Sequence, residues 1–226
     1  MIHVLRDAWP LILSGLFITG YTRIDQVMIK SMLGSEALGK YAVAVVLVEA
    51  WYVIPFVVTA SLFPAIVSAR FRDDGSYYRR LQHLYVLLFW VSLFIALAVT
   101  MIADPLTRFL FGQAYEGTGA VLSILIWNCV FVFFNFINEK WIIAENIQRM
   151  WLFVAPAGFL LNGVFNYFFI RKMGIQGAAV ASLLTFFFVS HLAFLMTGKT
   201  SRICLMQWKA LVMPFLGLRR LFGRPS

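Results

Sequence analysis

The sequence predicts an all-α integral membrane bundle of about six transmembrane helices. Of its 226 residues, 62% are hydrophobic and only 13% are charged, whereas an ordinary soluble domain is about half apolar and a quarter charged. The apolar residues come in blocks of roughly twenty, the length that a helix needs to cross a hydrocarbon core about 30 Å thick. Together these observations exclude a soluble domain, because this much apolar surface has to face lipid.

Short polar or turn-forming connections separate the apolar blocks, and none is long enough to mark a second domain. Pro55 and Pro64 in the second block and Pro156 in the fifth remove backbone hydrogen bonds, so they are expected to kink these helices. Small residues at 177–182 permit the sixth block to pack closely against a neighbour. The predicted spans are residues 8–29, 41–68, 84–103, 120–143, 150–170 and 177–196.

The net charge of +9 is explained by topology rather than by nucleic-acid binding, because the basic residues lie mainly between the apolar blocks. Most of them fall on one side when alternate connections are assigned to opposite sides, which predicts that both termini are cytoplasmic. We divide the chain into a six-helix bundle, residues 1–197, and a basic cytoplasmic tail, residues 198–226. The tail's apolar stretch, 210–218, is too short to span and contains Pro214, so we expect it to lie on membrane lipids.

No pattern in the sequence indicates an enzyme, a metal site or a cofactor. There is no glycine-rich phosphate loop, and the three histidines, His3, His83 and His191, are scattered along the chain. The two cysteines, Cys129 and Cys204, do not have metal-ligand spacing. We therefore look for function among the charged and polar residues inside the predicted spans.

Charges inside a span are functional candidates, because an ionisable side chain near the bilayer centre costs about 2.5 kcal/mol or more unless it faces protein or water. In the first span, Arg23 shares a helix face with Thr19, Gln26 and Lys30. Our hypothesis is that Arg23, Gln26 and Lys30 line an aqueous cavity and bind an anionic substrate group. The alternative is that Arg23 and Lys30 reach the membrane surface, since both lie in the last two turns.

Two carboxylates also fall inside spans. Asp25 is two residues from Arg23 and therefore on another face of the helix, where the two side chains do not form the usual helical pair. Glu49 lies in the second span. Each is predicted either to form an ion pair with a cation of a neighbouring helix or to bind a coupling ion.

Asparagines mark the fourth and fifth spans. Asn128, Asn135 and Asn138 lie along roughly one face of the fourth, and Asn162 and Asn166 are four residues apart in the fifth. Amides in a lumen suit hydrogen bonding to sugar hydroxyls, but they also join helices, at about 0.6 kcal/mol each. We interpret Asn128 and Asn135 as candidate sugar ligands, and Asn162 and Asn166 as helix contacts.

Six runs of sequence resemble bacterial polysaccharide flippases of the O-antigen translocase type, and the resemblance extends to about Thr197. The most specific feature is Arg-Ile-Asp-Gln at 23–26, followed by the Leu-Gly and Phe-Gly turns at 33–34 and 111–112. The six runs are residues 10–18, 21–29, 33–41, 61–64, 110–115 and 174–179.

This resemblance implies the multidrug, oligosaccharidyl-lipid and polysaccharide exporter superfamily. Its members place two helix bundles around a central cavity and move a lipid-diphosphate-linked sugar across the inner membrane by alternating access. The chain resembles only their second bundle, beginning at the seventh helix. We therefore expect a truncated gene product, or a half that works beside a first-half bundle or a second copy of itself.

The function predicted from the sequence is thus participation in translocating undecaprenyl-diphosphate-linked oligosaccharide. Two alternatives remain open. One is a non-transporting membrane remnant or an assembly partner of polysaccharide synthesis enzymes. The other is an ion-coupled exporter of small organic cations, although such a site should contain more carboxylates than Asp25 and Glu49.

Overall fold

The computed structural model describes residues 2–70, 74–195 and 198–222, with side chains described for 13–68, 75–191, 194–195 and 200–212. All regular structure in these ranges is helical, which confirms the predicted class. The elements are α1 (Ile2–Leu33), α2 (Ser35–Glu49), η1 (Ala50–Tyr52), α3 (Val53–Arg70), α4 (Asp74–Phe111), η2 (Gln113–Tyr115), α5 (Thr118–Leu125), α6 (Asn128–Ala144), η3 (Gln148–Met150), α7 (Trp151–Met173), α8 (Ile175–Ser190), η4 (Leu192–Leu195) and α9 (Gly198–Phe222).

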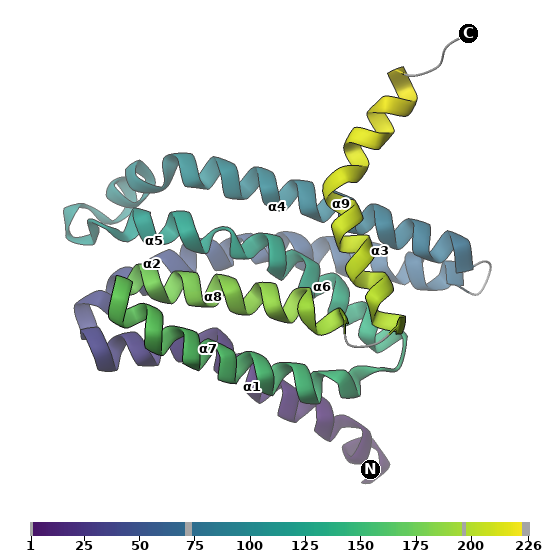
Figure 1. The fold of residues 1–226 in the computed structure, drawn as a ribbon, viewed down its shortest axis with the longest axis horizontal. Coiled ribbons are helices and arrows are strands. Elements are labelled where there is room, and N and C mark those ends of the chain that lie inside the picture. Colours follow the sequence, from purple (N-terminus) through teal and green to yellow (C-terminus); the bar gives the residue numbers. More distant parts are fainter. Residues whose placement is uncertain (1, 71–73, 196–197, 223–226) are drawn as a thin grey trace.

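The helices from α1 to α8 lie along one common axis and form a bundle (Figure 1). Within it α7 packs between α1 and α8, and α4 packs against α5 and α6. Four segments of the described chain are long and apolar enough to cross a membrane: Ser35–Ser68, Gly75–Phe111, Thr118–Ala144 and Gln148–Met173. Helix α8 is a shorter apolar helix, and α1, about 48 Å long at 1.5 Å per residue, contains Arg23 and Asp25.

Two of the predicted spans are interrupted inside the bundle. The second consists of α2 and α3 with the short 3₁₀ turn η1 between them, just before Pro55. The fourth consists of α5 and α6, joined at residues 126–127, where the N–H of Cys129 donates to the Ile126 carbonyl (3.0 Å) in a tighter i to i+3 bond. Membrane helices tolerate such breaks only where protein or a water-filled cavity satisfies the backbone.

The α7–α8 hairpin has the close contact that its small residues predicted. Gly174, at φ +60°, joins the two helices in a left-handed conformation that favours glycine. Three residues later, a Cβ at Gly177 would overlap the carbonyl oxygen of Phe169. Ala178 and Ala181 are fully buried, so the start of α8 packs directly on the backbone of α7.

Buried amides connect α7 to α8 farther along the hairpin. The Asn162 Nδ2 donates to Thr185 Oγ1 across the helices (3.0 Å), and the Asn166 Nδ2 donates to Asn162 Oδ1 (2.8 Å). Both asparagines are fully buried. This geometry agrees with the interpretation of the pair as helix contacts.

We expect Asn162→Leu to lower the thermal stability of the purified protein without removing its function. The substitution leaves the Thr185 hydroxyl with only its bond to the Ala181 carbonyl (2.8 Å), and interhelical amide bonds contribute about 0.6 kcal/mol on average. Thermal unfolding monitored by size-exclusion chromatography measures the shift. Gln113→Leu, at an exposed position in η2, also replaces a side-chain amide by leucine but outside the helix interface, and serves as the control. An equal shift in both variants would contradict the assigned role.

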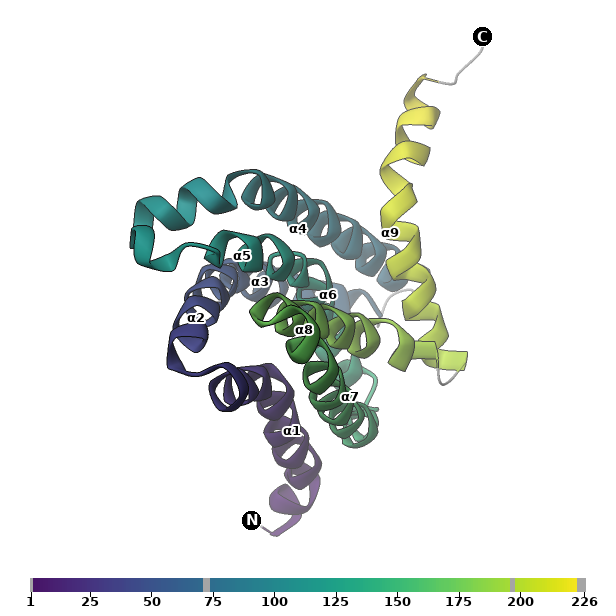
Figure 2. The same ribbon diagram turned by 60° about the vertical axis from the view of Figure 1, so that its left-hand side comes forward.

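Helix α9 runs across the bundle instead of along it, passing α4 and extending beyond the other helices (Figures 1 and 2). It contacts α4 and η4. The amide of Gln82 and the indole N–H of Trp90, both on α4, donate to the carbonyls of Met206 (2.9 Å) and Ala210 (3.3 Å). Residues 198–222 are therefore a helix attached to the bundle, whereas the sequence had indicated only a basic tail with a short apolar stretch.

Candidate functional site

A cavity of about 600 Å³ lies among α1, η1, α6, α7 and α8. Its wall combines hydroxyl, amide and carboxylate groups with aromatic rings, the mixture found in ligand pockets. The polar lining includes Thr19 and Thr22 of α1 and Asn135 and Glu139 of α6; the aromatic lining includes Tyr21, Tyr52, Phe136, Trp151 and Phe186.

Beside this cavity, three helices converge on the carboxylate of Asp25. The hydroxyl of Tyr41 on α2 donates to Asp25 Oδ2 (2.5 Å), as does the hydroxyl of Ser182 on α8 (3.2 Å). The backbone N–H of Gln26 donates to Oδ1 (2.7 Å). Asp25 is only 4% exposed, so a carboxylate in the membrane-spanning region is held by hydroxyl and amide donors.

A second, smaller cavity of about 50 Å³ lies against this carboxylate. Its lining includes Asp25, Tyr41, Glu49, Asn128 and Ser182. The Oδ1 atom of Asn128 is buried and has no hydrogen-bond partner among the described residues. A buried amide oxygen without a partner is costly, so this small cavity is a polar site with room for a water molecule or a small cation.

The two cavities are neighbours with a common wall. Tyr21, Thr22, Tyr52 and Phe186 line both of them. The helix breaks explain part of this arrangement, because Tyr52 belongs to η1 and Asn128 begins α6 directly after the interruption. A chamber wide enough for a ligand therefore adjoins a buried carboxylate across a single layer of side chains.

Arg23 forms an ion pair with Glu49 across α1 and α2, with an Nη2 to Oε1 distance of 3.0 Å. Two alternatives were predicted for each carboxylate, an ion pair with a neighbouring helix or a coupling ion. Glu49 forms the ion pair. Both side chains remain partly exposed, at 49% for Arg23 and 37% for Glu49. Asp25, in contrast, takes part in no ion pair among the described residues.

We expect a charge swap to identify this pair. Arg23→Glu and Glu49→Arg, each alone, place two like charges together and should lower the free energy of unfolding by up to about 1 kcal/mol, as expected for an exposed pair. The thermal midpoint should fall with it. The double variant restores opposite charges and should recover most of the loss. Thermal unfolding of the two single variants and the double variant measures this coupling, and simple additivity in the double variant would contradict it.

The remaining predicted residues are distributed around this site. Asn135 lines the large cavity and Asn128 the small one. Lys30 is exposed in the last turn of α1, where its positive charge interacts favourably with the negative end of the helix dipole. Gln26 is half-buried. In contrast to the hypothesis drawn from the sequence, none of Arg23, Gln26 and Lys30 is in the lining of the two cavities.

Asn138 donates from its Nδ2 to Asn135 Oδ1 (3.4 Å), so the two share a side of α6, but its other partners lie on other helices. Its Oδ1 accepts from the Tyr85 hydroxyl (2.7 Å) and from the Gln207 amide (3.0 Å), and its Nδ2 donates to the Ser190 carbonyl (3.3 Å). Fully buried, Asn138 connects α4, α6, α8 and α9. Asn138 lines neither cavity, and its contacts are structural.

Four residues of the site were not predicted from the sequence: Tyr41, Ser182, Tyr52 and Glu139. Tyr41 and Ser182 are 141 residues apart, so only the fold brings them to Asp25. Glu139 had a usable signal, because it lies four residues after Asn135 and therefore on the same helical face.

Comparisons with known proteins support the architecture. A family model described as "Polysaccharide biosynthesis protein" matches residues 1–70, and no curated protein matches the sequence. Among solved structures, the chain superposes on an outward-facing multidrug resistance MATE family transporter of the MOP superfamily, with a TM-score of 0.68 and 20% identity. The match covers 94% of this chain. The fold is that of part of a MATE transporter.

The match covers 53% of that transporter, so the chain spans about half the length of the solved structure. Together with the apolar helices, this likeness makes the chain a multi-pass membrane protein. No group of metal-ligating side chains occurs among the described residues of this MATE-like half.

Proposed function

We propose that the chain takes part in translocating a lipid-diphosphate-linked oligosaccharide, the undecaprenyl-linked precursor of a surface polysaccharide such as O-antigen, across a bacterial inner membrane. The observation that carries the proposal is the chamber of about 600 Å³, lined by hydroxyls, an amide and aromatic rings, within a MATE-like fold. The family model that matches residues 1–70 supports a polysaccharide rather than another cargo.

In this proposal each part of the site has its own role. Asn135 and Thr19 donate and accept hydrogen bonds with sugar hydroxyls, while Tyr52 and Trp151 provide apolar faces beside them. Arg23 and Lys30, which are exposed on α1 outside the lining of both cavities, attract the diphosphate from the surface of the bundle. Asp25, with Tyr41, Ser182 and Asn128, binds the coupling cation or proton.

The proposal requires a second half of the transporter, either a first-half bundle or a second copy of this chain, because alternating access needs two bodies that move about a shared site. Complementation of a strain that lacks its O-antigen flippase tests this requirement. The chain is expressed alone and then with a first-half bundle from a flippase of matched sugar specificity, and surface polysaccharide is measured.

Restoration by the chain alone would indicate a self-assembling transporter, and restoration only by the pair would indicate a split flippase. If neither restores polysaccharide despite confirmed membrane insertion, translocation is rejected in favour of a remnant or an assembly partner of synthesis enzymes. Arg23→Glu with Glu49→Arg adds a second readout, because a stable swapped pair that does not transport assigns Arg23 to the substrate.

One observation favours a second candidate, an ion-coupled exporter of small organic cations. Glu139 places a carboxylate in the lining of the large cavity beside aromatic rings, and cations bind favourably to such rings. Glu139→Gln distinguishes the two candidates: cation export should fall at least about tenfold, whereas polysaccharide at the cell surface should remain near the level of the unmodified chain.

A further inference from the structure

A groove of about 280 Å³ lies between the beginning of α4 and α9, apart from the two cavities described above. Its lining includes three cations from two helices, Arg79 on α4 and Arg202 and Lys209 on α9, and no acidic side chain among the described residues. All three are exposed, and none takes part in an ion pair within the described part of the chain. Three positive charges around one hollow attract an anion.

Two hydrogen bonds attach the part of α9 beside the groove to the bundle. Gln82, which also lines the groove, donates to the Met206 carbonyl (2.9 Å), and Gln207 donates to the buried Asn138 (3.0 Å). The guanidinium of Arg202 lies 3.4 Å from the centre of the Tyr78 ring, an arrangement that orients the cation. The Arg202 guanidinium is therefore oriented before a ligand binds, which lowers the entropic cost of binding.

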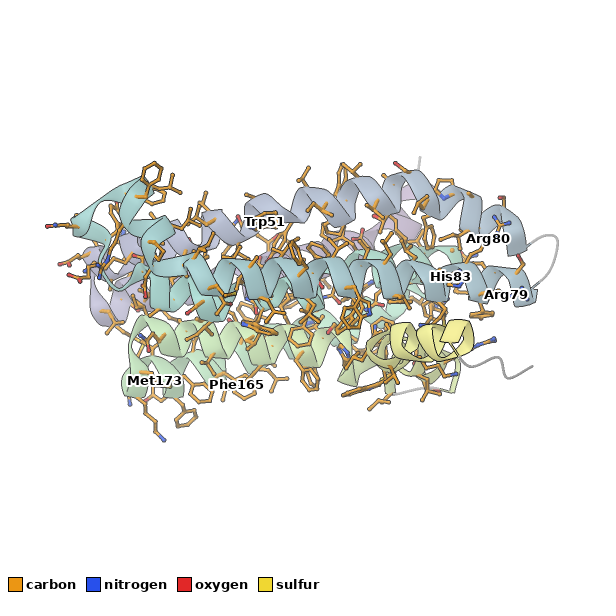
Figure 3. The ribbon with its side chains drawn as sticks, turned by 90° about the horizontal axis from the view of Figure 1, so that it is seen from above. Trp51, Arg79, Arg80, His83, Phe165 and Met173 are labelled. Carbon is orange, nitrogen blue, oxygen red and sulfur yellow. The ribbon has the colours of Figure 1, made fainter. Side chains whose placement is uncertain are left out.

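The position of the groove along α4 matches the headgroup layer of a membrane. The apolar part of α4 from Leu84 to Ala103 measures about 30 Å at 1.5 Å per residue, the thickness of the hydrocarbon core. Arg79 is five residues before Leu84, or about 7 Å beyond that core, within a polar layer roughly 5–8 Å thick on each side. Figure 3 shows Arg79, Arg80 and His83 at one end of the bundle and Met173 at the other.

The side chains next to the groove are apolar and uncovered. On α9, Leu205 is 58% exposed, Trp208 51% and Val212 53%, while Ile203 and Ala210 on the opposite side of the helix are fully buried. A helix with cations and large exposed apolar side chains is typical of an element lying in the membrane interface. Acyl chains next to the headgroup layer would cover these three residues.

We propose that this groove binds the phosphate of an anionic phospholipid, with Arg79, Arg202 and Lys209 around the headgroup and Leu205, Trp208 and Val212 against the acyl chains. The chemistry recognised by the cations is a phosphate anion. The apolar residues beside it assign that phosphate to a lipid rather than to a soluble ion. The volume, just below the range of pockets for small ligands, suits a headgroup.

The test measures lipid binding by the purified chain in a neutral detergent, so it does not depend on transport. Phosphatidylglycerol is titrated, and both thermal stabilisation and bound lipid, by native mass spectrometry, are recorded. Arg79→Gln with Lys209→Gln should weaken phosphatidylglycerol binding about thirtyfold, because each basic contact contributes about fivefold. The matched control, Arg171→Gln with Lys172→Gln, removes the same charge at the opposite end of the bundle and should leave binding unchanged.

Two further ligands separate the sources of phosphate. Phosphatidylcholine should bind weakly and equally to all variants, and inorganic phosphate at the same concentration should not compete. Equal binding of both lipids, effective competition by inorganic phosphate, or equal weakening in both double variants would overturn the proposal. If the Arg79/Lys209 variant does not fold, Arg79→Gln and Arg80→Gln are compared instead; Arg80 lies outside the groove lining, so only Arg79→Gln should weaken binding.

Discussion

Asp25→Asn is expected to abolish translocation while the protein remains inserted and folded. The asparagine has the same shape as aspartate, and its amide oxygen can still accept from the hydroxyls of Tyr41 and Ser182, so these contacts among α1, α2 and α8 persist. Its NH2 group takes the place of the oxygen that accepts from the Gln26 N–H, so only that bond is lost. The change removes the negative charge beside the small cavity. If Asp25 binds the coupling cation or proton, transport should fall at least about a hundredfold, because the charge that binds this ion is lost. A hundredfold loss of rate corresponds to an increase of about 3 kcal/mol in the activation free energy.

Surface polysaccharide in the complemented strain measures this loss, with membrane abundance of the variant measured in parallel. Glu36→Gln is the matched control, because it neutralises a carboxylate in an exposed i,i+4 pair with Lys40 (3.0 Å), and such pairs contribute only about 0.3–0.5 kcal/mol. If the Asp25→Asn variant gives polysaccharide at the normal level, the charge of Asp25 is not needed for transport. Asp25 would then be only a hydrogen-bond acceptor that joins three helices.

Gly177→Val should prevent the α7–α8 hairpin from forming and give a protein that is degraded or aggregated. Even one Cβ at this position would overlap the Phe169 carbonyl, and a backbone atom in a helix cannot move aside as a flexible side chain can. Overpacking of a core costs about 1–3 kcal/mol and sometimes more, and valine adds a branched side chain to this clash. Fluorescence-detected size-exclusion chromatography should show loss of the monodisperse peak.

The control for this variant is Gly163→Ala in α7, where an added Cβ meets nothing within 4 Å. Alanine is the better helix former by about 0.8–1.0 kcal/mol, so Gly163→Ala should keep or raise the thermal midpoint. A monodisperse, stable Gly177→Val protein would show that α8 can shift away from α7, contrary to the close packing of the hairpin.

Hydropathy predicted the helical class well, because span length and composition follow directly from membrane thickness. It was less informative about where helices are interrupted. Of the three prolines expected to kink helices, only Pro55 lies beside an interruption, the turn η1, whereas Pro64 and Pro156 lie inside the continuous helices α3 and α7. The break at residues 126–127 contains no proline. The docked helix α9 was also not recognised, since its buried side becomes apparent only against α4.

The site was predicted in part for a comparable reason. Charges inside spans identified Arg23, Asp25 and Glu49, because unpaired ions are rare there. The sequence did not reveal that Glu49 neutralises Arg23 while Asp25 receives hydroxyl donors, since these partners come from other helices. Periodicity placed Asn138 on the face of Asn128 and Asn135, and Asn138 does contact Asn135, but its bonds to Tyr85 and Gln207 on other helices could not be predicted from the sequence.

The attachment of α9 has a consequence for how this protein can change over evolutionary time. Gln82 and Trp90 bind carbonyl oxygens of the α9 backbone, and every amino acid supplies a carbonyl. These two contacts therefore do not depend on the side chains of α9, so its exposed residues, unlike the buried Gln207 that donates to Asn138 (3.0 Å), can be replaced without detaching the helix. Lineages living in membranes of different composition can alter the exposed surface of α9 while its place on the bundle is inherited unchanged.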